Sequence, residues 1–325
     1  MARELHSVLD REPLPTAPAR PPRRRPWLVP LLVALLLAQM TVAMVTTAVQ
    51  QTPTIDEPVY VATATDYLHE HRVRYNPEHP PLGKLIVEAG IAFADPHYDA
   101  SFKGDQGQVG RHLLYESGND PWRVMLWARL PVIVLTLAFG LVVFAFARDL
   151  MGSTGGLLAL ALYAFSPDLI THGSLATLDV PAAGFLLTSV WLLWRARHRP
   201  RLYVPLAGLA AGAASATKMN TLAAVPVLLA LAAWSVWRAG ERGASGVAPG
   251  ARNRRRAVVR ALGGALVVAL GALVVVWASY LVVDPRLRWA PHEQVPVVHG
   301  ARALLVDLLP FPEAYRDGMR VQFGF

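Results

Sequence analysis

Seven apolar runs, each close to the length needed to cross a lipid bilayer, constrain the fold of this 325-residue chain more than any other feature. A transmembrane helix needs about 20 apolar residues, because the hydrocarbon core is about 30 Å thick. Hydrophobic residues make up 54% of the chain and charged residues only 17%, against about 25% in soluble domains. We therefore expect an all-α, polytopic membrane helix bundle whose spans lie at residues 27–49, 123–147, 153–171, 179–194, 202–219, 221–237 and 259–283.

The arginines between these runs predict how the chain crosses the membrane. If the spans alternate in direction, the basic N-terminus lies on the same side as all the arginine-rich connections. The positive-inside rule makes that side cytoplasmic. We expect a multi-pass protein of the cytoplasmic membrane with a cytoplasmic N-terminus. The same count places residues 50–122, 172–178 and 284–325 on the extracytoplasmic side.

The predicted organisation has a basic, proline-rich and disordered tail at residues 1–26, because this composition builds no core. The transmembrane domain follows at 27–283, and residues 239–258, rich in Gly, Ala and Arg, are predicted to be a flexible cytoplasmic linker. Residues 284–325 are predicted to form an extracytoplasmic tail. Within the outer loop 50–122, helical spacing predicts two amphipathic, interfacial helices, from Pro58 to about Glu70 and from Pro81 to about Phe93.

A net charge of +8 and a pI near 10.1 raise the question of nucleic acid binding. The arginines gather in short segments between apolar runs and lack the interleaved aromatic residues that stack on bases. We therefore interpret them as topology signals and contacts to membrane lipids, and predict no nucleic-acid partner. The chain has no cysteine, so disulfides and thiol nucleophiles are excluded.

Unusual acids and cations gather in the first outer loop. Asp56-Glu57-Pro58 follows the first span closely, and Glu-His-Pro-Pro-Leu-Gly-Lys occupies positions Glu78 to Lys84. Carboxylates beside an apolar slab lose hydration and are usually functional there. We therefore look for the site in this loop.

Five features, taken in order along the chain, resemble one superfamily: the polyprenyl-phosphate-sugar-dependent glycosyltransferases of the GT-C fold, which include protein O-mannosyltransferases and aminoarabinose transferases. The features are the acidic pair after the first span, the outer-loop Pro-Pro-Leu with its nearby lysine, Arg129 one turn into the second span, Asp179 in Leu-Ala-Thr-Leu-Asp-Val-Pro, and the stretch from Gly208 to Lys218. The resemblance covers residues 27–283. Members of this group usually carry more spans and a further C-terminal region, so we expect either a fragment or a short active form.

The resemblance implies transfer of a sugar from a polyprenyl-phosphate donor to an acceptor hydroxyl on a protein, lipid or glycan. A hydroxyl nucleophile needs a carboxylate to take its proton, and Asp56 is our candidate for that base, with Glu57 in support. A phosphate leaving group needs fixed cations, for which the candidates are Lys84, Arg129 and Lys218. Glu78, His79 and Asp179 complete the predicted substrate-binding set. A single displacement predicts inversion at the anomeric carbon.

Each of these residues has a structural interpretation as well. Asp56 or Glu57 is a natural cap for the helix that begins at Pro58, and Lys84 or Lys218 can snorkel from a helix to the membrane surface. Glu78 and His79 fit a solvated turn. Arg129 requires an anionic partner, either a lipid phosphate or a carboxylate, because a charged side chain inside a span is costly. Helix capping accounts for Asp168.

No metal site is predicted, because Glu78, His79, His97 and His172 lack ligand spacing on any expected helix. A divalent cation stays open as a cofactor. Two other functions also stay open: a transporter or channel component that uses Asp56, Arg129 and Asp179, and a nonenzymatic membrane scaffold. Against transport, the polar residues cluster at one side, whereas transporter sites usually lie near the midplane.

Overall fold

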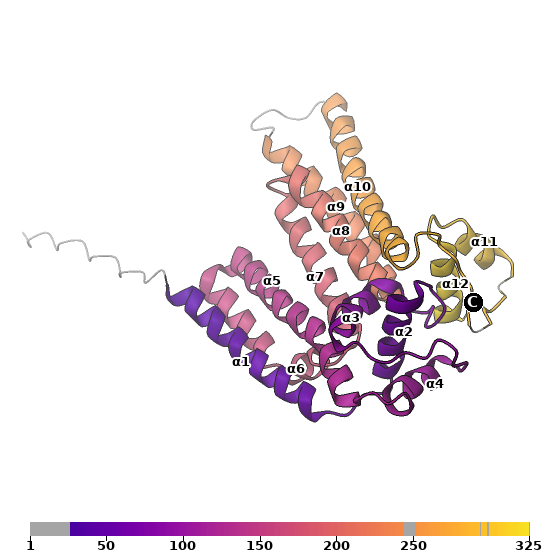
Figure 1. Ribbon diagram of the computed structural model, residues 1–325. Helices are drawn as coiled ribbons and strands as arrows, with labels where there is room; N and C mark the ends of the chain where they lie inside the picture. The colour runs from indigo at the N-terminus through magenta and orange to yellow at the C-terminus, as the bar shows by residue number, and fades with distance from the viewer. Residues whose placement is uncertain (1–26, 244–250, 293, 298, 325) are drawn as a thin grey trace, which may run out of the picture.

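Long helices lie side by side in the computed structural model, which describes residues 27–243, 251–292, 294–297 and 299–324 (Figure 1). The predicted basic tail, residues 1–26, lies outside these ranges. Within them the only β-type pairing is an isolated bridge between Val73 and Trp289, so the all-α prediction is confirmed. The long helices are α1 (Leu28–Gln50), α5 (Pro121–Ala164), α7 (Asp179–Ala196), α8 (Pro200–Thr217), α9 (Val225–Gly243) and α10 (Ala251–Val283).

Helix α5 contains two of the predicted spans. Its helical geometry breaks at Gly152, whose φ of 75° and ψ of −176° are readily adopted only by glycine. The two arms then pack on each other, because the Tyr163 hydroxyl donates to the Thr136 carbonyl at 2.9 Å and Gly156 fits against the backbone of Phe144. The second arm is followed by α6 (Pro167–Gly173). The spans predicted at 123–147 and 153–171 are thus the arms of a helical hairpin.

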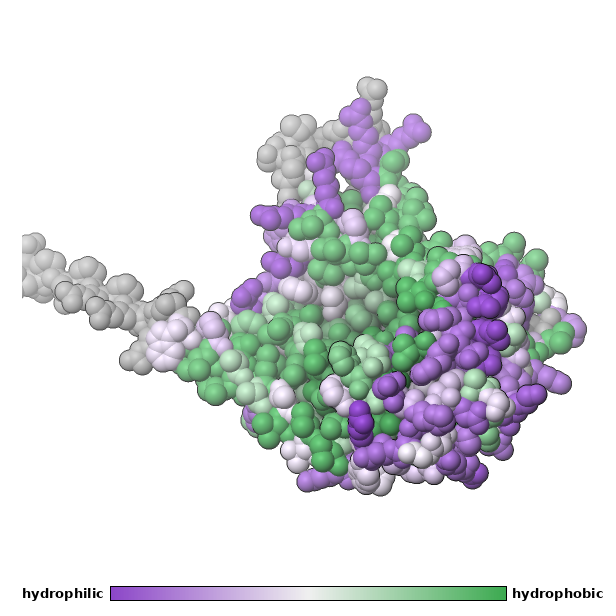
Figure 2. All heavy atoms as spheres, viewed as in Figure 1, coloured by the Kyte–Doolittle hydropathy of each residue, from purple (hydrophilic) through white to green (hydrophobic). Residues whose placement is uncertain are grey.

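Apolar side chains cover the middle of the bundle (Figure 2). Four described helical segments are long and apolar enough to cross a membrane: Leu28–Gln50, Pro121–Ala164, Met219–Glu241 and Arg254–Val283. The third of these segments includes the 3₁₀ turn η2 (Met219–Ala224), which leads into α9. Helices α7 and α8 coincide with the two remaining predicted spans and have 18 residues each. They fall outside the four, so the count of seven spans stays a prediction for this pair.

The outer-loop end of the bundle, which carries residues 50–122, forms a folded layer of α2 (Glu57–Glu70), α3 (Pro81–Ala94), α4 (Gln106–Arg111) and the π turn η1 (His112–Glu116). Both predicted helices of this loop are present. Helix α2, however, has no broad solvent-exposed face, because every residue from Tyr60 to Tyr67 is buried. Asp66, expected on a polar face, is buried and paired with Arg74. Helices α3 and α4 cover α2 and bury it.

The predicted tail is also structured, with α11 (Ala301–Asp307) and α12 (Glu313–Phe323). Tyr315 and Met319 of α12 join an apolar cluster with Met219. Gly318 lies so close to the backbone that an added Cβ would stand 2.0 Å from the Pro77 carbonyl oxygen. The tail therefore packs directly on the outer loop.

The prediction of a flexible linker over residues 239–258 is wrong at both edges. Helix α9 continues to Gly243 and α10 already begins at Ala251, leaving 244–250 outside the described residues. Alanine and arginine are strong helix formers, and the segment that begins α10 is rich in both. Helix propensity therefore outweighs the compositional signal for a linker.

Candidate functional site

A buried ion pair anchors the outer-loop end of the bundle. Glu57, in the first turn of α2, and Arg129 of α5 both have fully buried side chains and form a bidentate pair with two contacts of 2.8 Å. The Glu57 carboxylate also accepts hydrogen bonds from the backbone N–H of Thr54 and Ala176, at 2.9 and 2.8 Å. This clamp joins three separate segments of the chain.

Arg129 uses all of its donors inside the protein. Besides the two bonds to Glu57, its guanidinium donates to the carbonyls of Ala48, Gln51 and Thr52 at 2.7, 2.9 and 3.2 Å. A guanidinium has five N–H donors, and all five are satisfied here. The anionic partner that the sequence demanded is therefore a carboxylate, and the structure favours positioning over phosphate binding for both Arg129 and Glu57.

Asp56 lies beside the clamp yet differs from it. It occupies the N-cap position of α2, but its side chain makes no capping hydrogen bond. The residue is exposed, and among the described residues no hydrogen bond or ion pair engages its carboxylate. Capping therefore does not account for Asp56, and its carboxylate stands free at a fixed position.

Lys84 shapes the loop that precedes α3. Its buried ammonium donates to the Asn76 carbonyl, the Asn76 side chain and the His79 carbonyl at 2.8, 3.2 and 2.6 Å. Burial lowers the pKa of Lys84 to about 7, against the opposing effect of Glu78. Glu78 itself accepts from the Asn76 and Gln106 side chains. Since all three ammonium donors are used, Lys84 holds the loop instead of reaching outward.

Tyr60 and His79 join this loop to α2. Their ring centroids lie 5.9 Å apart. Burial and then the negative charges of Asp56, Asp179 and Glu78 raise the pKa of Tyr60. The Tyr60 hydroxyl therefore interacts electrostatically with three carboxylates. Burial and then the positive charge of Lys84 lower the pKa of His79 to about 4, with a smaller contribution from Lys218. His79 is therefore neutral at physiological pH.

Lys218 and Asp179 form the one ion pair that joins predicted site residues outside the clamp. The Lys218 ammonium, just after α8, lies 2.5 Å from the Asp179 carboxylate in the first turn of α7. The Asp179 side chain is 59% exposed and that of Lys218 21%. We call these two residues the rim pair. Being accessible, it can exchange partners with a ligand.

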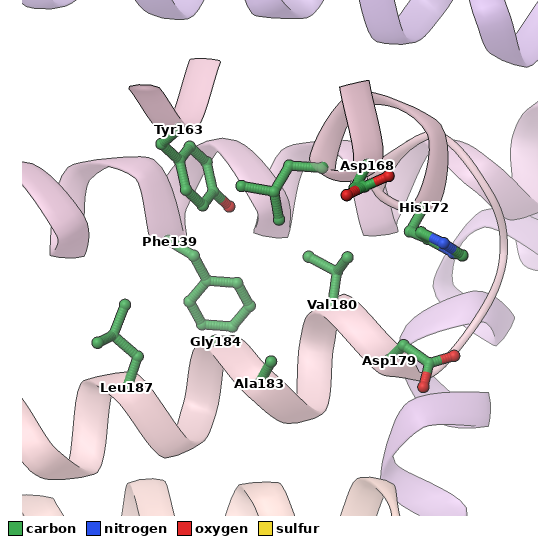
Figure 3. A pocket seen from close by; sticks show the side chains of 10 residues that line it. Phe139, Tyr163, Asp168, His172, Asp179, Val180, Ala183, Gly184 and Leu187 are labelled. Atoms are coloured by element: carbon green, nitrogen blue, oxygen red, sulfur yellow. The ribbon is translucent and has the colours of Figure 1, made fainter. Parts of the chain in front are cut away.

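A groove of about 250 Å³ opens beside the rim pair, between α5, α6 and α7. Asp168, His172 and Asp179 lie at one end, while Phe139, Leu187 and Gly184 line the other (Figure 3). The sequence assigned Asp168 to helix capping, but Ser166 is the cap of α6. An apolar channel with a polar mouth suits an amphiphilic ligand.

A metal centre finds no support in the described residues, where no group of three or more His, Asp or Glu side chains is close enough to hold an ion. The candidate site is therefore built from carboxylates, one accessible lysine, a neutral imidazole and a tyrosine.

Comparison with known families identifies the architecture. The sequence profile of the family described as dolichyl-phosphate-mannose-protein mannosyltransferase matches residues 32–244. The chain belongs to this family. Among solved structures, it is similar to the S. cerevisiae protein O-mannosyltransferase Pmt1–Pmt2 complex bound to the sugar donor, with 18% identity and a TM-score of 0.59. That likeness covers 78% of this chain and 34% of the yeast chain. No curated protein matches significantly.

Family membership confirms the predicted glycosyltransferase resemblance and the helical GT-C membrane fold. The matched residues include every predicted site residue, from Asp56 to Lys218. This chain spans about a third of the length of the yeast protein. Its α12 lies beyond the residues that the family profile matches.

Sequence reasoning missed Tyr60, Thr54 and Ala176. Tyr60 appeared only as an apolar member of a helical pattern, because nothing local indicates that three carboxylates approach it. Thr54 and Ala176 act through backbone N–H groups, which leave no signal in side-chain identity. The position of Thr54, three residues before Glu57, was the single available clue.

Proposed function

We propose that this chain transfers a sugar from a polyprenyl-phosphate donor to an acceptor hydroxyl, on the extracytoplasmic face of the cytoplasmic membrane, with Asp56 as general base. The observation that carries the proposal is the contrast between Asp56 and its neighbour. The Glu57 carboxylate is buried and bonded to Arg129 in the clamp. Asp56 is held by the same backbone but keeps a free, exposed carboxylate. A base needs both a fixed position and an available lone pair.

The groove beside the rim pair is the proposed binding site for the donor. Its apolar end suits the first isoprene units of a polyprenyl chain, and its mouth carries Asp168, His172 and Asp179. Donor phosphate would then lie near Lys218. Asp179 now neutralises this lysine, so we expect the incoming phosphate to displace Asp179, which then becomes free to accept hydrogen bonds from sugar hydroxyls.

The reaction balances as a single displacement. The acceptor oxygen forms a bond to the anomeric carbon, its proton passes to Asp56, and the bond from that carbon to the phosphate oxygen breaks. The electron pair leaves with the phosphate, whose growing charge Lys218 stabilises. No protonating acid is required, because a polyprenyl phosphate is already a good leaving group. Inversion at the anomeric carbon follows from the single step.

His79 and Tyr60 lie next to each other, and the charges of Asp56, Asp179 and Lys218 act on one or the other of them, so both are suited to contact the sugar. Arg129, Glu57 and Lys84 act indirectly, because their hydrogen-bonding groups are engaged within the protein. This division separates residues that hold the loop from residues that face the reactants. The transporter alternative is less well supported, because Arg129 is fully engaged and the family profile is that of a transferase.

The test uses purified chain in lipid nanodiscs with a radiolabelled polyprenyl-phosphate sugar and candidate acceptors. Asp56→Asn keeps the shape but removes the base, so transfer should fall on the order of 100-fold or more. Asp95→Asn is the matched control, because Asp95 is exposed in the same loop and has a φ of 47°, which asparagine tolerates. Equal transfer by Asp56→Asn and Asp95→Asn would remove Asp56 from the mechanism.

A further inference from the structure

Helix α12 contacts the two segments that carry the proposed donor contacts. It lies beside the outer-loop end of the bundle (Figure 1). An added Cβ at Gly318 would stand 2.0 Å from the Pro77 carbonyl oxygen and 2.6 Å from Met219 Cε. Pro77 lies two residues before His79, and Met219 directly follows Lys218. One residue of α12 therefore fits against both segments, without room for even a methyl group.

Tyr315 of the same helix holds the chain on the other side of Lys218. The Tyr315 side chain is fully buried, and its hydroxyl donates to the Ser215 carbonyl at 3.2 Å. Ser215 lies in the last turn of α8, and the chain leaves helical geometry at Lys218, whose φ of −146° and ψ of 123° are extended. Helix α12 thus contacts the backbone or side chain on both sides of this break, at Ser215 and at Met219. Because the helix ends here, the position of Lys218 depends on these flanking contacts.

Helix α12 is itself anchored to the end of α10 and to the segment that follows it. The Trp289 indole donates to the Asp317 carboxylate at 2.7 Å. The ring centroid of Tyr315 lies 6.2 Å from that of Tyr280 and 4.5 Å from that of Phe311. All three rings lie in or against one buried apolar cluster. A helix anchored in this way can hold its two neighbouring segments at a constant separation.

The two segments also act on each other electrostatically. Burial, then the positive charge of Lys84 and, to a smaller degree, that of Lys218 lower the pKa of His79. In the proposed reaction, Lys218 stabilises the leaving phosphate and His79 contacts the sugar. Their separation must therefore match the distance between the phosphate and the sugar of one donor molecule. An error of about 1 Å in such an alignment can cost about 100-fold in rate.

We propose that Tyr315 and Gly318 are positioning residues for the donor, and that α12 sets the separation between Lys218 and His79. Both residues of α12 act through the segments that they contact. The inference rests on the proposed function of Lys218 and His79.

The acceptor side provides an internal reference. Asp56, the proposed base, adjoins Glu57, which the clamp with Arg129 holds in place. Within the described residues, the hydrogen bonds of this clamp reach no residue of α12. Substitutions in α12 should therefore impair use of the donor and leave use of the acceptor unchanged.

Steady-state transfer kinetics in lipid nanodiscs test this difference. Tyr315→Phe removes only a hydroxyl, so the KM for the donor should rise about 5-fold, the equivalent of one lost hydrogen bond. The KM for the acceptor should not change. Ser189→Ala is the matched control, because the buried Ser189 hydroxyl also donates to a carbonyl of α8, that of Ala207, at 2.9 Å. It should lower thermal stability about as much and leave the donor KM unchanged.

Gly318→Ala tests the same inference with a wedge. The added methyl group must push the two segments apart, so kcat/KM for the donor should fall on the order of 100-fold. The separation itself can be measured without transfer, because the chain has no cysteine. Spin labels on Asn220→Cys, next to Met219, and on Glu78→Cys, next to Pro77, report it by pulsed electron paramagnetic resonance. Gly318→Ala should lengthen that distance.

An unchanged donor KM in Tyr315→Phe would overturn the positioning role, and so would an equal rise in Ser189→Ala. An acceptor KM that rises together with the donor KM would also overturn it, because that pattern indicates a general loosening of the fold. An unaltered chain that transfers no sugar would instead refute the proposed function. The label distance then decides the inference about α12, and an unchanged distance in Gly318→Ala would contradict it.

Discussion

The clamp and the rim pair are both carboxylate–cation pairs at the outer-loop end of the bundle, yet they serve different purposes. In the clamp, both side chains are fully buried and every donor of Arg129 is satisfied. In the rim pair, the Asp179 side chain is more than half exposed and lines a groove. A sealed pair fixes structure because nothing can compete for its partners. An accessible pair can exchange a partner for a substrate.

Breaking the clamp should have the largest effect on stability. Glu57→Ala leaves the Arg129 charge buried and unpaired, so we expect a loss of about 3 to 5 kcal/mol in the free energy of unfolding. Thermal unfolding in detergent measures it. Asp56→Ala, one residue earlier, should change stability by about 0.5 kcal/mol or less, because the Asp56 side chain is exposed and makes no capping hydrogen bond. Similar losses in both variants would contradict the assigned difference between these neighbours.

The rim pair should show the reverse pattern. Lys218→Ala removes the cation proposed to stabilise the leaving phosphate, so transfer should fall on the order of 100-fold. Stability should change by about 1 kcal/mol or less, because accessible ion pairs contribute little. Transfer kinetics and a thermal melt on the same sample separate the two effects. A large stability loss with normal transfer would make Lys218 structural.

The loop that carries His79 should make the stability of the chain depend on pH. The pKa of His79 is lowered to about 4 in the folded chain, against about 6.5 in an unfolded one. The unfolded state therefore binds a proton first as pH falls, so this contribution to stability is present above pH 6.5 and is lost as pH falls toward 4.

The free energy of unfolding, measured by denaturant titration, should therefore be about 2 kcal/mol lower at pH 4.5 than at pH 7 because of His79 alone. His79→Gln cannot titrate and should show a correspondingly shallower pH dependence. Identical slopes for the variant and the unaltered chain would remove His79 as the source.

Helix α12 packs through Gly318 on the loop that contains Pro77. Gly318→Ala forces a methyl group against the Pro77 carbonyl, and such overpacking costs about 1 to 3 kcal/mol. Gly263→Ala in α10 is the control, because an added Cβ there meets nothing within 4 Å. That substitution should be neutral or stabilising, since alanine favours helices. If Gly318→Ala were equally harmless, α12 would not fix the position of the loop.

Much of this architecture is predictable from local patterns. Apolar runs of membrane-spanning length predicted the helices of the bundle, and Pro58 and Pro81 predicted the starts of α2 and α3, because proline is favoured in a first helical turn. The linker was misjudged, since composition says little about helix ends. Burial of α2 was also missed, because its helical pattern gives no information about what covers the polar face.

By itself the sequence determined that the chain is a helical membrane protein with its unusual acids at one end, because hydrophobicity and charge act on each residue wherever it lies. Only the tertiary structure decided which acid is free. Asp56 and Glu57 are adjacent and chemically alike, and what distinguishes them is a set of partners as many as 119 residues away in the chain. Burial and hydrogen-bond saturation depend on those distant contacts, and they separate the carboxylate that holds the fold from the one that remains available for chemistry.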